Sequence, residues 1–262
     1  MKILVLAGTA DGRQLAQELL QRGYAVTVSV LTGYGAELAA AVGLTTRFGA
    51  LDEDSLRDLL LSGGFQAVVD ATHPYATNIT ALARNVCHNM QLPFFCWERP
   101  STERFDHPLV HWVPDIPTAA RQVARLGQRI LLTTGSNSLP EWFSQPVIRD
   151  KELFVRVLPT ARILGRCESL GLSPGRIIAA QGPFTVAWNK AMCEQYGIDV
   201  VVAKDSGSTG GTPQKIEACL VLNIPIVILS RPDEHHDQAD IGLLGIKPKS
   251  IIEFVAHVEG QL

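Results

Sequence analysis

Short apolar runs alternate with longer amphipathic stretches along most of the chain. The first run, Ile3 to Leu6, has no polar interruption, which is typical of a strand buried on both faces of a sheet. After a turn rich in small residues, apolar positions recur at helical spacing from Arg13 to Leu20. Repetition of this unit predicts strand–helix–strand crossovers, which build parallel sheets.

The first hundred residues contain five such units. The expected strands are 3–6, 25–31, 45–48, 67–69 and 94–97, and the expected helices are 13–20, 37–42, 52–61 and 79–90. The pattern is that of a doubly wound parallel sheet.

The sequence pattern changes between Ser101 and Pro117, where three prolines and several charged residues replace the periodic apolar positions. We therefore expect a domain boundary there. Alternation then resumes, with expected strands at 129–133, 153–158, 176–180, 199–203 and 225–229 and expected helices at 118–126, 162–170, 185–196, 213–222 and 250–258. The sequence thus predicts two α/β domains, residues 1–100 and 101–262, whose ligand-binding ends face a central cleft.

Composition narrows the class of protein. The chain has 262 residues, enough for a sizeable core, and its net charge of −3 does not favour a nucleic-acid partner. No apolar run reaches about 18 residues, so no membrane span is expected. The five cysteines form no C-x-x-C pair, and we expect reduced, mostly buried thiols in a cytoplasmic protein without a secretory signal.

The first turn offers a phosphate site. Strand, glycine-containing turn and helix bring unpaired first-turn N–H groups and the positive end of the helix dipole to one point. The full G-x-G-x-x-G fingerprint is absent, and a turn that holds no ligand is an equal alternative on these residues alone. The candidate cofactor-binding residues are Gly8, Thr9, Ala10, Asp11 and Gly12.

The end of the second expected strand bears on the choice of cofactor. NAD enzymes usually carry an acid there for the ribose 2′-OH, but this chain has none before Glu37. Ser29 and Thr32 could instead donate to a 2′-phosphate, which favours NADP(H). An ordinary polar loop is the alternative, with equal weight.

The loop after the fourth expected strand, Asp70 to Ala76, is the most distinctive in the chain. His73 and Tyr75 could donate to a ligand, and Asp70 and Thr72 could bond the local backbone. The alternative is that Asp70 caps the following helix and His73 is an ordinary loop histidine.

A second candidate site precedes the helix expected at 213–222. Glycines and hydroxyl residues stand between Lys204 and Lys215, an arrangement suited to carboxylates or phosphates, although no G-K-[ST] occurs. A flexible loop with solvated lysines is the alternative. His235, His236 and Asp237 lack metal-ligand spacing, so no metal site is expected.

Several motifs together resemble the precorrin-6A reductases of corrin (vitamin B12) biosynthesis. The chain has alanine at position 7, where glycine is expected in that family. The matching motifs are LAGTADG at 6–12, DATHPYA at 70–76, TTG at 133–135, QGPF at 181–184, KDSG with a following GG at 204–211, Lys215, and Arg231-Pro232.

The resemblance implies NADPH-dependent reduction of a ring double bond of precorrin-6A, or of its cobalt-bearing counterpart, to precorrin-6B. It also implies two Rossmann-like domains, with room for exchange of a strand between them, and it allows neighbouring corrin-pathway enzymes as partners. NADPH would lie on the first domain, with Ser29, Thr32 and Thr72 among its contacts. His73, Tyr75 and Asp70 would border the reacting groups as catalytic residues. The acidic side chains of the macrocycle would meet Lys204, Ser206, Gly207, Gly210, Gly211, Lys215 and Arg231.

Two other functions compete with this one. A redox sensor could bind NADP(H) without turnover, but it would not need the anion-binding loops of the second domain. A short-chain-type reductase needs Tyr-x-x-x-Lys, and no tyrosine in the chain has lysine four residues later.

Overall fold

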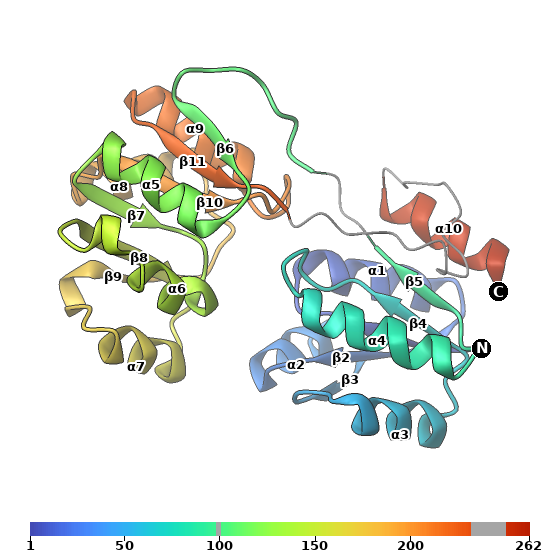
Figure 1. Cartoon of the computed structure of the whole chain (residues 1–262). Coiled ribbons are helices and arrows are strands. Elements are labelled where there is room, and N and C mark those ends of the chain that lie inside the picture. The colour runs from blue at the N-terminus through green and yellow to red at the C-terminus, as the bar shows by residue number, and fades with distance from the viewer. Residues whose placement is uncertain (98–100, 232–249) are drawn as a thin grey trace. The chain divides into compact units, whose positions relative to one another are not determined.

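A computed structural model describes residues 1–97, 101–231 and 250–262. These residues divide into two compact units, and the division falls after residue 100, where the sequence pattern changes (Figure 1). The first unit contains residues 1–97 and 250–262, and the second contains residues 101–231. Among the described residues, no helix combines the length and the apolar character needed to cross a membrane.

The first unit is built on a parallel sheet in the order β3-β2-β1-β4-β5, five strands among the described residues. Its strands are β1 (Lys2–Leu6), β2 (Ala25–Val30), β3 (Thr45–Phe48), β4 (Ala67–Asp70) and β5 (Phe94–Cys96), and its connecting helices are α1 (Ala10–Gln21), α2 (Gly33–Ala40), α3 (Glu53–Gly63) and α4 (Thr77–Asn89). Helix α1 packs on one face of the sheet, and α3 and α4 pack on the other. The doubly wound sheet predicted from periodicity is confirmed.

Local chemistry sets where the helices begin. The hydroxyl of Thr9 accepts the Gly12 N–H at 3.2 Å, and α1 therefore starts at Ala10 rather than at Arg13. Asp52 and Ser55 form a reciprocal capping box at the start of α3, as the acidic first turn suggested. Helix α2 starts four residues before the expected Glu37 because Thr32 caps it.

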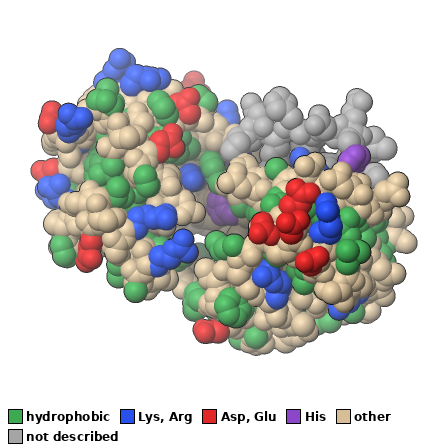
Figure 2. Space-filling model, turned by 60° about the horizontal axis from the view of Figure 1, so that its bottom comes forward, with side chains coloured by type: hydrophobic (Ala, Val, Ile, Leu, Met, Phe, Trp, Pro, Cys, Tyr) green, Lys and Arg blue, Asp and Glu red, His purple; other side chains and the backbone are tan. Residues whose placement is uncertain are grey.

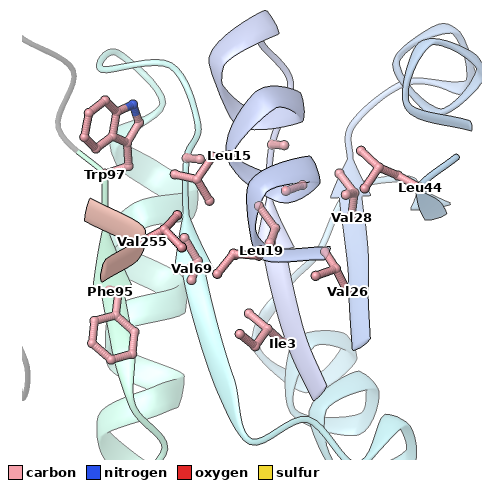
Figure 3. Close-up of a cluster of buried hydrophobic side chains, with 14 of the residues drawn as sticks. Ile3, Leu15, Leu19, Val26, Val28, Leu44, Val69, Phe95, Trp97 and Val255 are labelled. Carbon is pink, nitrogen blue, oxygen red and sulfur yellow. The ribbon is translucent and has the colours of Figure 1, made fainter. Parts of the chain in front are cut away.

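The C-terminal helix α10 (Ile251–Gln261) belongs to the first unit, which corrects the expected 101–262 domain. Phe254, Val255 and Val258 are fully buried in the same apolar cluster as Leu15 and Leu19 of α1. Figure 3 shows Val255 close to these leucines, Val69 and Trp97. The helix is apolar on one side, but its sequence does not say which of two similar sheets will cover that side.

The second unit has a parallel sheet in the order β6-β11-β10-β7-β8-β9 within its described residues. Its strands are β6 (Val110–Val113), β7 (Arg129–Leu132), β8 (Glu152–Val157), β9 (Ile177–Ala179), β10 (Val200–Lys204) and β11 (Ile226–Leu229). Its α-helices are α5 (Ile116–Leu126), α6 (Leu139–Phe143), α7 (Ala161–Ser169), α8 (Val186–Gln195) and α9 (Thr212–Leu222), and its 3₁₀ turns are η1 (Ser136–Ser138), η2 (Pro146–Ile148) and η3 (Pro174–Arg176).

Strand β6 lies inside the segment expected to be an irregular boundary. It is four residues long and forms the edge of the sheet by pairing with β11, more than a hundred residues later in the chain. Such a short strand depends on a distant partner, so its own sequence gives little sign of it. Each sheet takes its described strands from one continuous stretch of chain. Within the described ranges, helix α10 follows the second unit in the chain but belongs to the first unit.

All five cysteines are buried and none is paired with another, as expected. Burial raises the pKa of Cys87 to about 12 and that of Cys193 to about 11. Thiols with such pKa values are protonated at neutral pH and unreactive.

Candidate functional site

Two sequence motifs meet at the carboxyl edge of the first sheet. The strand order reverses between β1 and β4, which is where doubly wound sheets bind ligands. The N–H of Ala71 donates to the carbonyl of Leu6 at 2.9 Å, so the turn after β1 and the loop after β4 begin side by side. The structure thus brings Gly8–Gly12 and Asp70–Tyr75 to one place.

The two glycines of the first turn have different roles. A Cβ on Gly12 would lie 2.9 Å from both the Cβ of Ala7 and the carbonyl oxygen of Ala71, so only glycine lets α1 approach the strand ends so closely. A Cβ on Gly8 would have nothing within 4 Å. Gly8 is exposed and leaves open space beside the helix start, as a pyrophosphate site requires.

The other residues of this turn divide between ligand side and interior. Ala10 is exposed at the first position of α1, and Thr9 is half-buried as the helix cap. The side chain of Asp11 is buried, with 5% of the residue exposed. Asp11 is therefore suited to meet a ligand through its backbone rather than through its carboxylate.

A cation stands beside the expected 2′-phosphate site. Arg47, at the end of β3, is in register with Ser29 of β2, and its Nη1 donates to the hydroxyl of Ser29 at 3.0 Å. The guanidinium is only half-buried. Sequence reasoning selected Ser29 but missed Arg47, although a basic residue ending the next strand was a usable signal.

Thr32 has a structural task as well. Its hydroxyl accepts the Gly35 N–H at 3.1 Å and caps α2. A hydroxyl that accepts one bond can still donate its own proton, and Thr32 is exposed. Ser29 is 5% exposed and accepts from Arg47, so its hydroxyl supports the guanidinium, and Thr32 and Arg47 are the more accessible donors.

Asp70 holds the loop after β4 in shape. It is 1% exposed, and its carboxylate accepts the Thr72 N–H at 2.9 Å and the Thr80 hydroxyl at 2.6 Å. These bonds tie the strand end to the loop and to α4. These contacts favour the alternative in which Asp70 positions the loop, and the catalytic role expected for Asp70 stays a prediction.

His73 and Tyr75 are both half-buried on this loop, with ring centroids 5.7 Å apart. The N–H of Tyr75 donates to Nδ1 of His73 at 3.3 Å. A histidine that accepts at Nδ1 in its neutral form carries its proton on Nε2. Thr72, the residue before His73, is also half-buried.

In the second unit, the strand order reverses between β7 and β10. The loop after β10 is stabilised by its own hydrogen bonds. Asp205, 3% exposed, accepts the Gly207 N–H at 3.2 Å and the Thr102 hydroxyl at 2.7 Å, and Thr212 accepts the Ser206 N–H at 3.0 Å. Ser206 is itself 7% exposed, so its hydroxyl serves the loop rather than an open surface.

The glycines of this loop are mainly structural. A Cβ on Gly210 would lie 2.0 Å from the Ser206 hydroxyl oxygen, and Gly207 and Gly211 have φ of 70° and 74°. Such angles are rare for residues with a side chain. Arg231, expected to be a free cation for substrate, is paired with Asp205 at 3.5 Å, which offsets part of its charge.

Lys215 is 8% exposed, which rules out the alternative of a solvated lysine there. Its Nζ donates to the carbonyl of Gly210 at 3.0 Å. Burial, with a further contribution from the charge of Arg156, lowers its pKa to about 7. Lys204 is half-buried, and burial lowers its pKa in part against the opposing charge of Glu141. Arg156 was not selected from the sequence because it stands within an apolar strand.

The TTG and QGPF motifs make contacts within the second unit. The side chain of Thr133 donates to the carbonyl of Val202 at 2.7 Å and so joins β7 to β10. Phe184 of the QGPF motif stacks on Trp188, with centroids 4.2 Å apart. His235, His236 and Asp237 lie outside the described residues. Among the described residues, no three His, Cys, Asp or Glu side chains are grouped to hold a metal ion.

These features define a class: a two-unit α/β protein of Rossmann-like design, with a glycine-containing turn at the first helix of one sheet and buried basic side chains on the other. The family model described as precorrin-6x reductase CbiJ/CobK matches residues 2–244. The chain belongs to this family, and the resemblance found in its motifs is confirmed.

Individual relatives agree with the family match. The chain is 35% identical over 231 residues to the cobalt-precorrin-6A reductase of Salmonella typhimurium, covering 88% of this chain and 87% of that protein. It is 31% identical to the precorrin-6A reductase of Rhodococcus erythropolis, with 88% and 89% covered. A solved structure named CobK precorrin-6A reductase has the same fold, with a TM-score of 0.75, 22% identity, and coverage of 100% of this chain and 97% of that one.

Proposed function

We propose that this protein reduces a ring double bond of precorrin-6A, or of its cobalt-bearing counterpart, to precorrin-6B with NADPH, as a step of cobalamin biosynthesis. Membership of a reductase family supports the reaction class. The observation that carries the choice of cofactor is Arg47 on Ser29, at the strand ends where an NAD enzyme would place an acid.

The first unit fits a dinucleotide phosphate. Gly8 leaves room for a pyrophosphate at the start of α1, and the helix dipole favours the negative charge. Arg47, held by the buried hydroxyl of Ser29, would bind a 2′-phosphate through charge-assisted hydrogen bonds, with Thr32 as a further donor. Bound NADPH would supply the hydride for the reduction.

The loop after β4 would supply the donors near the reaction. Asp70 fixes the loop through Thr72 and Thr80, and the loop fixes the tautomer of His73. The hydride reaches one atom of the double bond, and a proton must reach the other. His73 would donate that proton from Nε2 when its imidazole is protonated, or hold a water that does so. Tyr75 is the second candidate donor on the same loop.

The second unit would hold the acidic side chains of the macrocycle. Lys204 is the last residue of β10, and Lys215 lies in α9, the helix that follows this strand. Burial lowers the pKa of both lysines. Carboxylates are their natural partners.

The test mixes purified protein anaerobically with precorrin-6A, with and without cobalt, and with either NADPH or NADH. Nicotinamide absorbance and product mass are followed. We expect NADPH oxidation matched by a gain of two hydrogens in the macrocycle, and the better substrate assigns the pathway. Tight NADPH binding without NADPH oxidation in the presence of either substrate form would favour the redox-sensor alternative, and equal rates with NADH would contradict the role of Arg47.

A further inference from the structure

Two cations are buried together in the second unit. Arg156 of β8 is 7% exposed and Lys215 of α9 is 8% exposed. Along β8, Leu153, Val155 and Val157 enter the apolar cluster on one face of the sheet, so the alternate residue Arg156 points to the face that α8 and α9 cover. We call Arg156 and Lys215 the cation pair.

The described partners of the cation pair are neutral. Arg156 donates from Nη1 to the side-chain oxygen of Asn189 at 2.7 Å, and its guanidinium lies 4.2 Å from the ring centroid of Phe184. Lys215 donates to a backbone carbonyl. In residues 1–97, 101–231 and 250–262, no Asp or Glu forms an ion pair with either side chain.

This arrangement is costly for the free protein. Desolvation lowers the pKa of Arg156 to about 10, and desolvation together with the charge of Arg156 lowers that of Lys215 to about 7. The other ionisable groups packed around them are the thiols of Cys193 and Cys219, whose pKa values burial raises, so they remain neutral. Because burial and the charge of Arg156 both oppose protonation of Lys215, an anion beside the two groups would favour the charged form of both, and the described chain does not provide one.

The position of the cation pair suits a ligand rather than a structural anion. Arg156 is the last residue but one of β8, and Lys215 lies one turn into the helix that follows β10. Both are therefore at the carboxyl edge of the sheet, where ligands bind. The neighbouring residues Gln181 to Pro183 are exposed, and Trp188 is 37% exposed. Figure 2 shows other Lys and Arg side chains on the surface, interspersed with acidic ones, where water already solvates them.

We propose that Arg156 and Lys215 together bind one carboxylate of the tetrapyrrole substrate. This inference rests on the proposed function, which gives the protein a substrate whose acidic side chains are carboxylates. A planar guanidinium matches a carboxylate with two parallel hydrogen bonds, and the ammonium of Lys215 adds a compact charge. Asn189 and the stacked rings of Phe184 and Trp188 restrict the guanidinium before the ligand arrives.

The test compares wild-type protein with Arg156→Gln and Lys215→Met. The matched control is Arg129→Gln, because Arg129 also lies on an aromatic ring, that of Phe154 at 5.1 Å, but at the amino-terminal edge of the same sheet. Binding of precorrin-6A without NADPH is measured by quenching of tryptophan fluorescence. Uroporphyrin, which carries carboxylates on a related ring, is the second probe, and its methyl ester shows whether the carboxylates are needed. NADPH affinity is measured in parallel.

We expect each of the two substitutions to weaken binding of the carboxylate probes about 10- to 100-fold, the loss typical of a hydrogen bond to a charged group. Arg129→Gln and NADPH affinity should stay at the wild-type level. Wild-type affinity retained in both variants would overturn the inference, as would equal binding of the methyl ester or absence of binding of either probe by the wild type. If the protein turns over precorrin-6A but neither substitution weakens binding of the carboxylate probes, the proposed function stands and this inference fails. If the substitutions weaken porphyrin binding but the protein does not turn over precorrin-6A, this inference stands and the proposed function fails.

Discussion

The two units share one architecture but differ at the carboxyl edges of their sheets. The ligand edge of the first sheet is made of backbone, glycine and a helix start, with one half-buried arginine at its side. The ligand edge of the second sheet carries desolvated cations on β8, β10 and α9.

This difference between the units matches the way negative charge is distributed over the ligand proposed for each of them. A pyrophosphate concentrates its charge at one point, which backbone N–H groups and a helix dipole can surround. Carboxylates spread around a macrocycle are separate charges, and each needs its own side-chain cation. Ligand binding would therefore depend mainly on close packing of backbone and glycine in the first unit, and on buried basic side chains in the second.

The largest expected effect is on chemistry in the first unit. We expect His73→Ala to lower kcat by about 100-fold or more, as loss of a general acid commonly does, with NADPH affinity close to wild type. His88→Ala is the matched control, because His88 is exposed at the end of α4 in the same unit. Stopped-flow oxidation and equilibrium binding of NADPH measure the two quantities. Unchanged turnover would remove His73 from the mechanism and leave Tyr75 or water as the donor.

The next expected effect is a pH dependence of the free energy of unfolding that comes from Lys215 in the second unit. The pKa of Lys215 is about 7 in the folded protein and 10.5 in the reference state, so between these values the unfolded chain holds a proton that the folded chain has lost. Stability must then rise with pH over this range, by up to about 1.4 kcal/mol per pH unit for this one group. The cost is fully present below pH 7.

Lys215→Met removes this dependence, and it should raise the Tm at pH 7 while weakening the site. Denaturant unfolding of both proteins between pH 6.5 and 9.5 measures the difference in slope. Parallel curves for the variant and the wild type would show that Lys215 is solvated in solution.

A third prediction concerns close packing in the first unit. Gly12→Ala should destabilise the protein by about 1–3 kcal/mol through overpacking against Ala7 and Ala71. Alanine is the better helix former, so a net loss isolates the steric clash. Gly8→Ala should leave the free energy of unfolding unchanged, because its Cβ would meet nothing within 4 Å. Equal stability of the two variants in urea unfolding would contradict the close approach at Gly12.

The smallest effect is on cofactor choice. Arg47→Gln should raise the KM for NADPH about 10-fold, in line with the loss of one charge-assisted hydrogen bond, and leave the KM for NADH unchanged. Arg57→Gln, in an exposed pair with Glu53 on α3, is the control. Equal changes with both cofactors would place Arg47 away from the 2′-phosphate.

Local sequence determined much of this protein. Buried strands such as β4 contain unbroken apolar runs, here residues 67–69, and the acidic residues beside Asp52 indicate the start of α3, because both signals depend on neighbours in the chain. The motifs at Gly8–Gly12 and Asp70–Tyr75 were recognisable because each folds as one short turn. That they would meet followed from the general rule that parallel strands end at one edge.

Only the tertiary structure decided what depends on distant partners. The edge strand Val110–Val113 needs β11, and helix α10 could be assigned only by the cluster that buries Phe254. The roles of single side chains were decided in the same way. Asp70 proved to be a support because Thr80 bonds it, and Arg156 became a candidate because α8 and α9 cover it. Burial and hydrogen-bond partners come from packing between remote segments, which no local pattern encodes.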